Sequence, residues 1–149
     1  MTTIGIVGCG AIGQALLKAS EAGTLTPSIT GITSRTEGSA RAFLTTLNNP
    51  PEYFSQTELI AKSDLIVEAA GGAVIPELAS EVFQSGKDLM AISVGALVEH
   101  PEILDMAKER RCKIYAPSGA IAGLDGIKSA SAGKIDSVIM TTRKPLEAL

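Results

Sequence analysis

The hydrophobic residues of this chain fall into short apolar runs that alternate with segments of helical periodicity. The apolar runs are bounded by turn-forming residues, and they predict strands at residues 2–8, 28–34, 52–54, 63–71, 87–96 and 112–119. The segments between them predict helices at residues 11–23, 37–49, 55–63, 73–86 and 100–111. Strands that alternate with helices indicate a parallel sheet with crossover helices. We therefore expect an α/β fold with a doubly wound parallel sheet of the Rossmann type.

Three of the predicted helices carry recognisable start signals. Ser55 and Glu58 have the spacing of a capping box. Pro76 lies near the first turn of its helix, where a missing N–H costs little. Pro101 stands at the first position of the helix at residues 100–111, and His100 before it is able to cap. We therefore interpret His100, the only histidine of the chain, as structural.

The residues after the sixth predicted strand exceed what one such sheet needs. They predict a loop and helix at residues 120–133 and a seventh strand at residues 134–145. We therefore expect a dinucleotide-binding domain at residues 1–119, followed by a further segment at residues 120–149. Because the seventh strand has no evident partner in the sequence, we expect residues 135–142 to pair with another copy in a homodimer or larger oligomer.

The amino-acid composition argues against several classes of binding partner. The chain has 149 residues, 45% of them hydrophobic, and a net charge of −3, with two Tyr, three Phe and no Trp. Without basic runs or stacking aromatics, a nucleic-acid partner is not expected. No basic leader or apolar stretch of about 20 residues is present, so we expect no membrane span or export. Cys9 and Cys112 lack other metal-ligating neighbours, which predicts no metal site and a reducing, cytoplasmic location.

The sequence GIVGCGAIGQ at residues 5–14 contains the spacing G-x-G-x-x-G. A predicted strand precedes it and a predicted helix follows, which is the context of a dinucleotide fingerprint rather than of an ordinary strand–helix turn. Gly8 would allow the tight turn, Gly10 would let the backbone approach a pyrophosphate, and Gly13 would let the helix pack against the strand. The residues between these glycines are also expected to border the cofactor: Cys9, Ala11 and Ile12.

The end of the second predicted strand indicates which dinucleotide is bound. A carboxylate at this place binds the ribose hydroxyls of NAD, but this chain has Ser34 and Arg35. A guanidinium matches a 2′-phosphate, so NADP is favoured over, or accepted beside, NAD. The alternative is that Arg35 is a solvated surface residue. Glu68 lies towards the C-terminal end of the fourth predicted strand, near where the nicotinamide would bind. It has no basic partner in sequence, so we assign no catalytic residue.

Four segments carry a more specific resemblance: VEAAGG at residues 67–72, SVGAL at 93–97, APSGAIAGLDGIKSASAG at 116–133 and MTTRKP at 140–145. With them the chain, from Ile4 to about Pro145, resembles the L-aspartate dehydrogenase family. The resemblance implies a two-domain, homo-oligomeric enzyme that oxidises L-aspartate with NAD or NADP to iminosuccinate, which serves NAD biosynthesis or hydrolyses to oxaloacetate and ammonia. It also implies that residues 120–149 are a connecting helix and the first strand of the second, α+β domain, which serves substrate binding and dimerisation. It also implies further residues at the cofactor, which are Ala69, Ala70, Gly71, Ser93, Val94, Gly95, Ser118, Gly119, Ala120, Ile121 and Ala122.

Two departures from that family shape the expectations. Many members end the second strand with Asp where Ser34 stands here, which argues against a strict preference for NAD. The catalytic histidine and the substrate-binding cations of the family lie in a second half that these 149 residues do not contain, so we expect no aspartate oxidation by the chain alone. Two other interpretations stay open. One is a non-catalytic NAD(P)-binding module, and the other is a homoserine-type dehydrogenase, which fits APSGAIAGLD less well.

Overall fold

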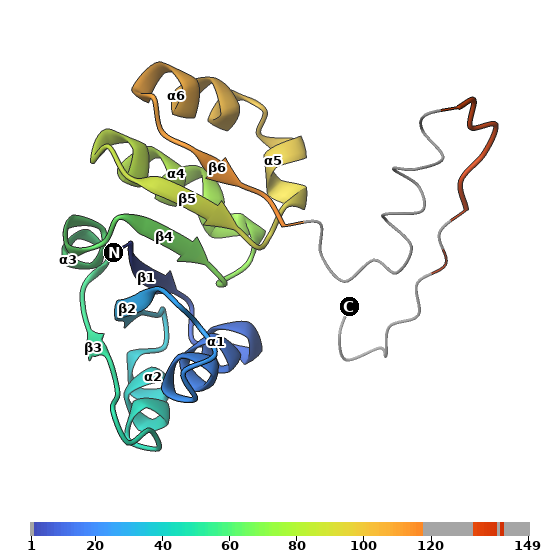
Figure 1. Ribbon diagram of the computed structural model, residues 1–149. Coiled ribbons are helices and arrows are strands. Elements are labelled where there is room, and N and C mark those ends of the chain that lie inside the picture. Colours follow the sequence, from blue (N-terminus) through green and yellow to red (C-terminus); the bar gives the residue numbers. More distant parts are fainter. Residues whose placement is uncertain (1, 118–132, 140, 142–149) are drawn as a thin grey trace. The chain divides into compact units, whose positions relative to one another are not determined.

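The predicted doubly wound sheet is confirmed. The computed structural model describes residues 2–117, 133–139 and 141, and its contacts divide the chain into residues 1–117 and 118–149. The first unit contains one six-stranded sheet in which every neighbouring pair is parallel, with the order β3-β2-β1-β4-β5-β6 (Figure 1). This order reverses direction between β1 and β4, which is the place where such sheets bind ligands.

Most elements lie close to their predicted positions. The strands are β1 (Thr3–Val7), β2 (Ser28–Thr33), β3 (Glu52–Tyr53), β4 (Leu65–Glu68), β5 (Asp88–Ala91) and β6 (Ile114–Tyr115). The helices are α1 (Ala11–Glu21), α2 (Glu37–Leu44), α3 (Gln56–Lys62), the 3₁₀ turn η1 (Gly72–Val74), α4 (Ile75–Gln84), α5 (Gly95–Glu99) and α6 (Glu102–Arg110).

The strands are continuously apolar because both faces of the sheet carry buried side chains. In β1, Ile6 belongs to a cluster with Leu17 of α1 and Leu44 of α2, whereas the next residue, Val7, belongs to the cluster of the other face. The helical side chains of that second cluster come from α3, α4, α5 and α6, and Phe83 of α4 is one of them. Ile6 and Val7, which are neighbours in β1, therefore pack against the helices on opposite faces of the sheet. This packing holds the carboxyl end of β1 in place.

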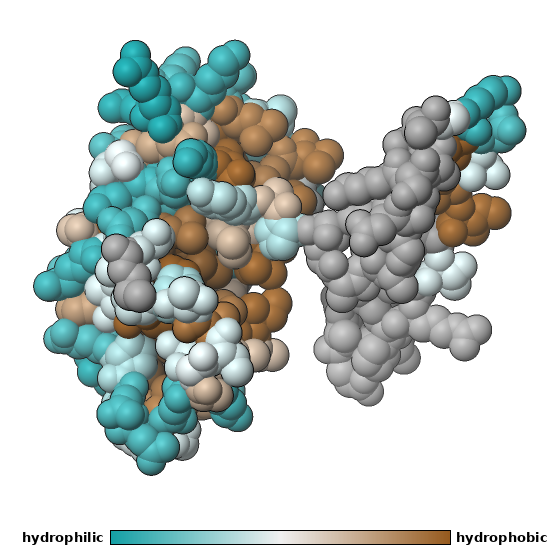
Figure 2. Space-filling view, viewed as in Figure 1, coloured by the Kyte–Doolittle hydropathy of each residue, from teal (hydrophilic) through white to brown (hydrophobic). Residues whose placement is uncertain are grey.

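The direction of the crossovers decides which face each helix covers. Right-handed connections from β1 towards β3 put α1 and α2 on one face, and the later connections, which run the other way, put their helices on the opposite face. In the described part of the chain, no helix therefore covers β4 and β5 on the α1 side. Figure 2 shows hydrophobic side chains gathered there. A cavity of about 190 Å³ at this face has only apolar lining residues, Val67, Met90 and Ile92 among them.

Two elements differ from the prediction. The strand predicted at residues 87–96 is wrong in its second half, because β5 ends at Ala91 and α5 begins at Gly95. The backbone N–H of Ser93 donates to the Glu68 carboxylate instead of to a neighbouring strand, at 2.9 Å. The helix predicted at residues 37–49 stops at Leu44, where the Thr45 hydroxyl, which follows, bonds back to a carbonyl of the last turn at 2.8 Å.

The helix starts are partly as predicted. The capping box of α3 is confirmed, with the Glu58 N–H donating to Ser55 Oγ at 3.4 Å and the Ser55 N–H donating to Glu58 Oε2 at 3.1 Å. Pro76 lies in the first turn of α4. The cap predicted for His100 is wrong. Its side chain makes no cap bond to α6 and instead meets Glu102 at 3.1 Å, since His100 also ends the short helix α5.

The segment after the sheet is described in part. The helix predicted at residues 120–133 lies almost entirely outside the described residues, as does the end of the strand predicted at 134–145. Within residues 134–139 and 141 the structure has no regular strand. Among the helices of the described residues, none is both long and apolar enough to cross a bilayer.

Candidate functional site

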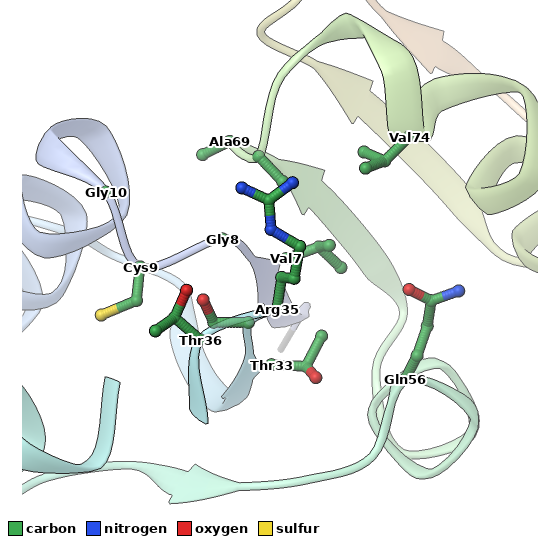
Figure 3. A pocket seen from close by; sticks show the side chains of 12 residues that line it. Val7, Gly8, Cys9, Gly10, Thr33, Arg35, Thr36, Gln56, Ala69 and Val74 are labelled. Atoms are coloured by element: carbon green, nitrogen blue, oxygen red, sulfur yellow. The ribbon is translucent and has the colours of Figure 1, made fainter. Parts of the chain in front are cut away.

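A cavity of about 450 Å³ opens at the carboxyl ends of β1, β2 and β4 (Figure 3). It therefore lies at the point where the strand order reverses. Its lining residues are Val7, Gly8, Cys9, Gly10, Thr33, Ser34, Arg35, Thr36, Gln56, Ala69, Ala70 and Val74. Backbone hydrogen bonds join the strand ends below it, since the Gly8 N–H donates to Thr33 O and the Ala69 N–H donates to Val7 O, both at 2.8 Å.

The glycine loop between β1 and α1 forms one wall of this cavity. Gly8 has a φ of 110°, and a Cβ there would collide with the carbonyl oxygen of Ala69. A Cβ on Gly13 would collide with the carbonyl oxygen of Gly8, so that residue lets α1 pack against the loop. Gly10 differs from both. Its φ is an ordinary −80°, and a Cβ there would meet no atom within 4 Å. The loop therefore leaves open space beside Gly10 while its other glycines are closely packed.

The first turn of α1 is free to bind an anion. Gly10 is the N-cap, it offers no side chain to the helix amides, and the first turn contains no acidic residue. The unpaired N–H groups and the helix dipole at such an end attract negative charge. Gln14 orders the loop, because its Nε2 donates to Cys9 O at 3.1 Å. The open space beside Gly10 and the uncapped helix end together fit a pyrophosphate group.

The loop after β2 brings a cation to the cavity. Figure 3 shows the guanidinium of Arg35 extended into it. Within the described residues Arg35 forms no ion pair, whereas Arg41 pairs with Glu37 at 2.7 Å and lies over the Tyr53 ring. The Tyr53 hydroxyl donates to Ser34 O at 2.8 Å and so holds the start of this loop.

The thiol of Cys9 also lines the cavity. The side chain is partly buried, and this desolvation raises the pKa of the thiol above its ordinary value. A raised pKa favours the neutral thiol, which is a poor nucleophile. Cys9 is thus suited to contact with a ligand rather than to covalent chemistry.

The loop after β4 is organised by the Glu68 carboxylate, which is completely buried. Its Oε1 accepts from the N–H groups of Ala70 and Gly71, both at 2.7 Å, and from Ser93 Oγ at 3.1 Å. Its Oε2 accepts from the Ser93 N–H at 2.9 Å. The carboxylate therefore joins the loop after β4 to the loop after β5 and does not face the cavity.

The structure brings together seven of the residues proposed from the sequence, namely Gly8, Cys9, Gly10, Ser34, Arg35, Ala69 and Ala70. The other proposed residues in the described part do not line it. Ala11, Ile12, Gly13 and Gly71 follow lining residues closely in the sequence, whereas Ser93, Val94 and Gly95 belong to the loop after β5 and the start of α5. The proposed residues 118–122 lie outside the described residues. Sequence reasoning missed Val7, Thr33, Thr36, Gln56 and Val74. They could have been found from their positions in the chain, because strand ends and helix starts meet at this edge of a parallel sheet.

The described residues contain no obvious acid, base or metal centre at this place. No group of three His, Cys, Asp or Glu side chains suited to a metal was found among them. The cavity lining found in the same part of the chain holds no His, Lys, Asp or Glu. The open space beside Gly10, the uncapped start of α1 and the Arg35 guanidinium together suit an anionic, elongated ligand.

Comparison with known proteins agrees with this geometry. Residues 8–117 match the family described as "Homoserine dehydrogenase, NAD binding domain". The L-aspartate dehydrogenases of Methanocella arvoryzae and Methanosarcina mazei are 42% and 37% identical over 153 aligned residues, which cover 100% of this chain and 56% of each relative. The chain thus spans little more than half the length of these relatives.

A solved structure shows the same fold. The WlbA dehydrogenase from Bordetella pertussis, in complex with NADH and UDP-GlcNAcA, aligns with a TM-score of 0.70 at 20% identity, covering 88% of this chain and 42% of that one. The matched family is described as an NAD-binding domain, so a nicotinamide dinucleotide is the cofactor class of this family. The chain belongs to the family of homoserine dehydrogenase-type NAD-binding domains, and its resemblance to the L-aspartate dehydrogenases is confirmed over its whole length.

Proposed function

We propose that this chain is the dinucleotide-binding part of an L-aspartate dehydrogenase-like oxidoreductase. Such an enzyme transfers hydride from L-aspartate to NADP or NAD and yields iminosuccinate, which serves NAD biosynthesis or hydrolyses to oxaloacetate and ammonia. The observation that carries the proposal is the identity of 42% and 37% with proteins of that name along the whole chain. The lined cavity at the glycine loop supports it.

The proposed cofactor would lie across the carboxyl ends of the strands. The glycine loop and the first turn of α1 would hold the pyrophosphate. The Arg35 guanidinium, supported by the Ser34 hydroxyl, would hold a 2′-phosphate, so NADP should bind at least as well as NAD. When bound, the nicotinamide ring supplies the hydride acceptor. The loops after β4 and β5, with residues 118–122 as the resemblance implies, would border that ring.

We expect the 149-residue chain to bind dinucleotide without oxidising aspartate. Hydride transfer requires a held substrate and a base for the ammonium proton, and the cavity lining within the described residues supplies neither His, Lys, Asp nor Glu. The side chains of this lining also support the second candidate function, a dinucleotide-binding module that catalyses no reaction.

Two measurements test the proposal. Isothermal calorimetry of the purified chain with NADP and NAD should give saturable binding, and the absence of binding to both would refute it. Absorbance of reduced nicotinamide, followed with aspartate present, should stay at the level without enzyme. Turnover of aspartate by this chain would show that the catalytic groups are among these 149 residues, and would refute the module as well.

We also propose that the chain self-associates through residues 135–142. In the described part of this segment, Val138 and Ile139 are 57% and 89% exposed, and exposed apolar side chains favour association. Light scattering should give at least a dimer for the wild type and a smaller species for a variant that combines Val138→Lys with Ile139→Lys. A wild type that stays monomeric at high concentration would refute this part.

A further inference from the structure

We propose that Glu68 is a positioning residue for the nicotinamide half of the site. It would act by holding the loop after β4 and the loop after β5 as one wall, without touching the ligand itself. The inference rests on the proposed dinucleotide site and adds to it a residue that sequence analysis left without a role.

The first argument is the burial of the charge. Glu68 is 0% exposed, and none of the ion pairs found in the described part of the chain includes it. A buried carboxylate is costly unless hydrogen bonds satisfy it. Here four donors do so, two in the loop after β4, which lines the cavity, and two at Ser93 in the loop after β5. The carboxylate is therefore part of the construction of those loops rather than a group awaiting a substrate.

The second argument is the shape that the loop after β4 must adopt. Gly71 has φ 105° and ψ 155°, a conformation that residues with side chains rarely take. The N–H groups of Ala70 and Gly71 converge on the single oxygen Oε1, which fixes this turn. Ala69 and Ala70 in the same turn line the cavity, and Val74 follows them (Figure 3). Without the carboxylate, this part of the lining would lose its internal support.

The third argument is the division of the ligand between the halves of the sheet. In a doubly wound sheet each half binds one mononucleotide, and the halves meet where the strand order reverses. The glycine loop and Arg35 belong to the β1–β3 half, which would bind the adenine nucleotide. Glu68 and Ser93 belong to the β4–β6 half. Disturbing Glu68 should therefore weaken the binding of the whole dinucleotide more than that of its adenine fragment.

Glu68→Gln is the informative variant because it keeps size and shape. Every partner of the carboxylate is a donor, so an amide must point its NH₂ at a donor whichever way it is turned. Ser93→Ala is milder, since it removes only the hydroxyl bond to Oε1. Asp64→Asn is a matched control. Its carboxylate, just before the other end of β4, accepts from Thr3 N at 2.8 Å and Thr3 Oγ1 at 2.9 Å, away from the cavity.

The experiment measures the affinities for NADP and for adenosine 2′,5′-bisphosphate, which represents the adenine half, by calorimetry on each folded variant. We expect Glu68→Gln to weaken NADP about 10-fold and Ser93→Ala about 3-fold. Both should bind the bisphosphate within about 2-fold of wild type, and Asp64→Asn should change neither affinity. A merely structural Glu68 would instead change both ligands together or neither.

Each other outcome is decisive. Unchanged NADP affinity in Glu68→Gln, or equal losses for both ligands, would overturn the positioning role. If Glu68→Gln does not fold, Ser93→Ala decides by the same comparison. A wild type that binds neither ligand would refute the dinucleotide site itself, and a wild type that binds both while Glu68→Gln behaves as wild type would refute only the role of Glu68.

Discussion

The ends of β2 and β4 lie on opposite sides of β1 at the same edge of the sheet, and they use charge in opposite ways. After β2, Arg35 extends into the cavity without an ion pair in the described residues. At the end of β4, Glu68 turns into the protein and accepts four hydrogen bonds. Of these two charged side chains, the one that points into the cavity is therefore the one that forms no ion pair within the described residues.

The support behind each strand end explains the difference. The loop after β2 is held from the side by the neutral Tyr53 hydroxyl, at 2.8 Å from Ser34 O, so Arg35 is not needed for its shape. The described side-chain hydrogen bonds to the loops after β4 and β5 all come from the buried Glu68 carboxylate. The charge that follows β2 therefore lines the cavity, whereas the charge at the end of β4 joins two loops inside the protein.

The variant with the largest expected effect blocks the proposed ligand site between the ends of β2 and β4. Gly10→Val should weaken NADP and NAD binding about 100-fold, or roughly 2.7 kcal/mol, because the valine side chain would fill the space proposed for the pyrophosphate. The fold should be retained, since Gly10 has an ordinary φ of −80° and a Cβ there meets no atom within 4 Å. Calorimetry measures the affinities, and thermal unfolding checks the fold.

Gly10→Ala is the graded control for that variant, and its loss should be smaller. If the valine variant binds both dinucleotides like the wild type, the cavity beside Gly10 is not the pyrophosphate site. The contrast between Arg35 and Glu68 would then have no bearing on dinucleotide binding.

The variant with the next largest effect tests the loop after β2 alone. Arg35→Ala should weaken NADP about 10-fold, or roughly 1.4 kcal/mol, and leave NAD nearly unchanged, because only NADP has a 2′-phosphate. Arg41→Ala is the matched control, since that guanidinium already pairs with Glu37 and lies over Tyr53. Parallel titrations with both dinucleotides give the selectivity. Equal losses for NAD and NADP in Arg35→Ala would show that Arg35 does not read the phosphate.

A smaller effect tests how the β2 loop is held. Tyr53→Phe removes the hydroxyl that donates to Ser34 O, and such a bond contributes about 1 kcal/mol, so NADP affinity should fall about 5-fold. Adenosine 2′,5′-bisphosphate should weaken by the same factor, because the loop serves the adenine half. An affinity for the bisphosphate equal to that of the wild type would mean that the loop keeps its position without this clasp.

The smallest effect concerns the thiol between the strand ends. Burial raises the pKa of Cys9, so the reactive thiolate is scarcer in the folded protein than in the unfolded chain at the same pH. Alkylation by iodoacetamide should therefore be slower when folded, with its pH profile shifted upward, and bound NADP should slow it further. The pKa of Cys112 is also raised, by burial and then by Asp88, so the measurement uses a Cys112→Ser background. Identical rates with and without NADP would place Cys9 outside the ligand contact.

The features that sequence analysis predicted correctly depend on neighbours in the chain. Alternating apolar runs and helical periodicity predicted the parallel sheet, and the capping box of Ser55 and Glu58 predicted the start of α3. Each rests on residues a few positions apart. The approach of the loop after β4 to Gly8 was not visible in this way, because Ala69 is distant in sequence.

The features that were missed depend on contacts between distant segments. The helix α5 replaced a predicted strand because the Ser93 N–H bonds to Glu68, which lies 25 positions earlier. The same separation hid the link between Glu68 and Ser93, although the other partners of the carboxylate, Ala70 and Gly71, follow it within three positions. His100 was expected to cap a helix, but its side chain meets Glu102 because α5 ends there. Local pattern therefore identifies the elements, and tertiary hydrogen bonds decide where they end at the site.

The unequal lengths of the strands imply an order of local opening. β1 pairs over five residues with β2 and over four with β4, whereas the outer strands β3 and β6 have two residues each. Amide protons of β1 and β4 should exchange with deuterium most slowly, and those of the outer strands should exchange through frequent fraying. The glycine loop leaves the sheet from β1, so the floor of the cavity belongs to the part of the sheet that opens last.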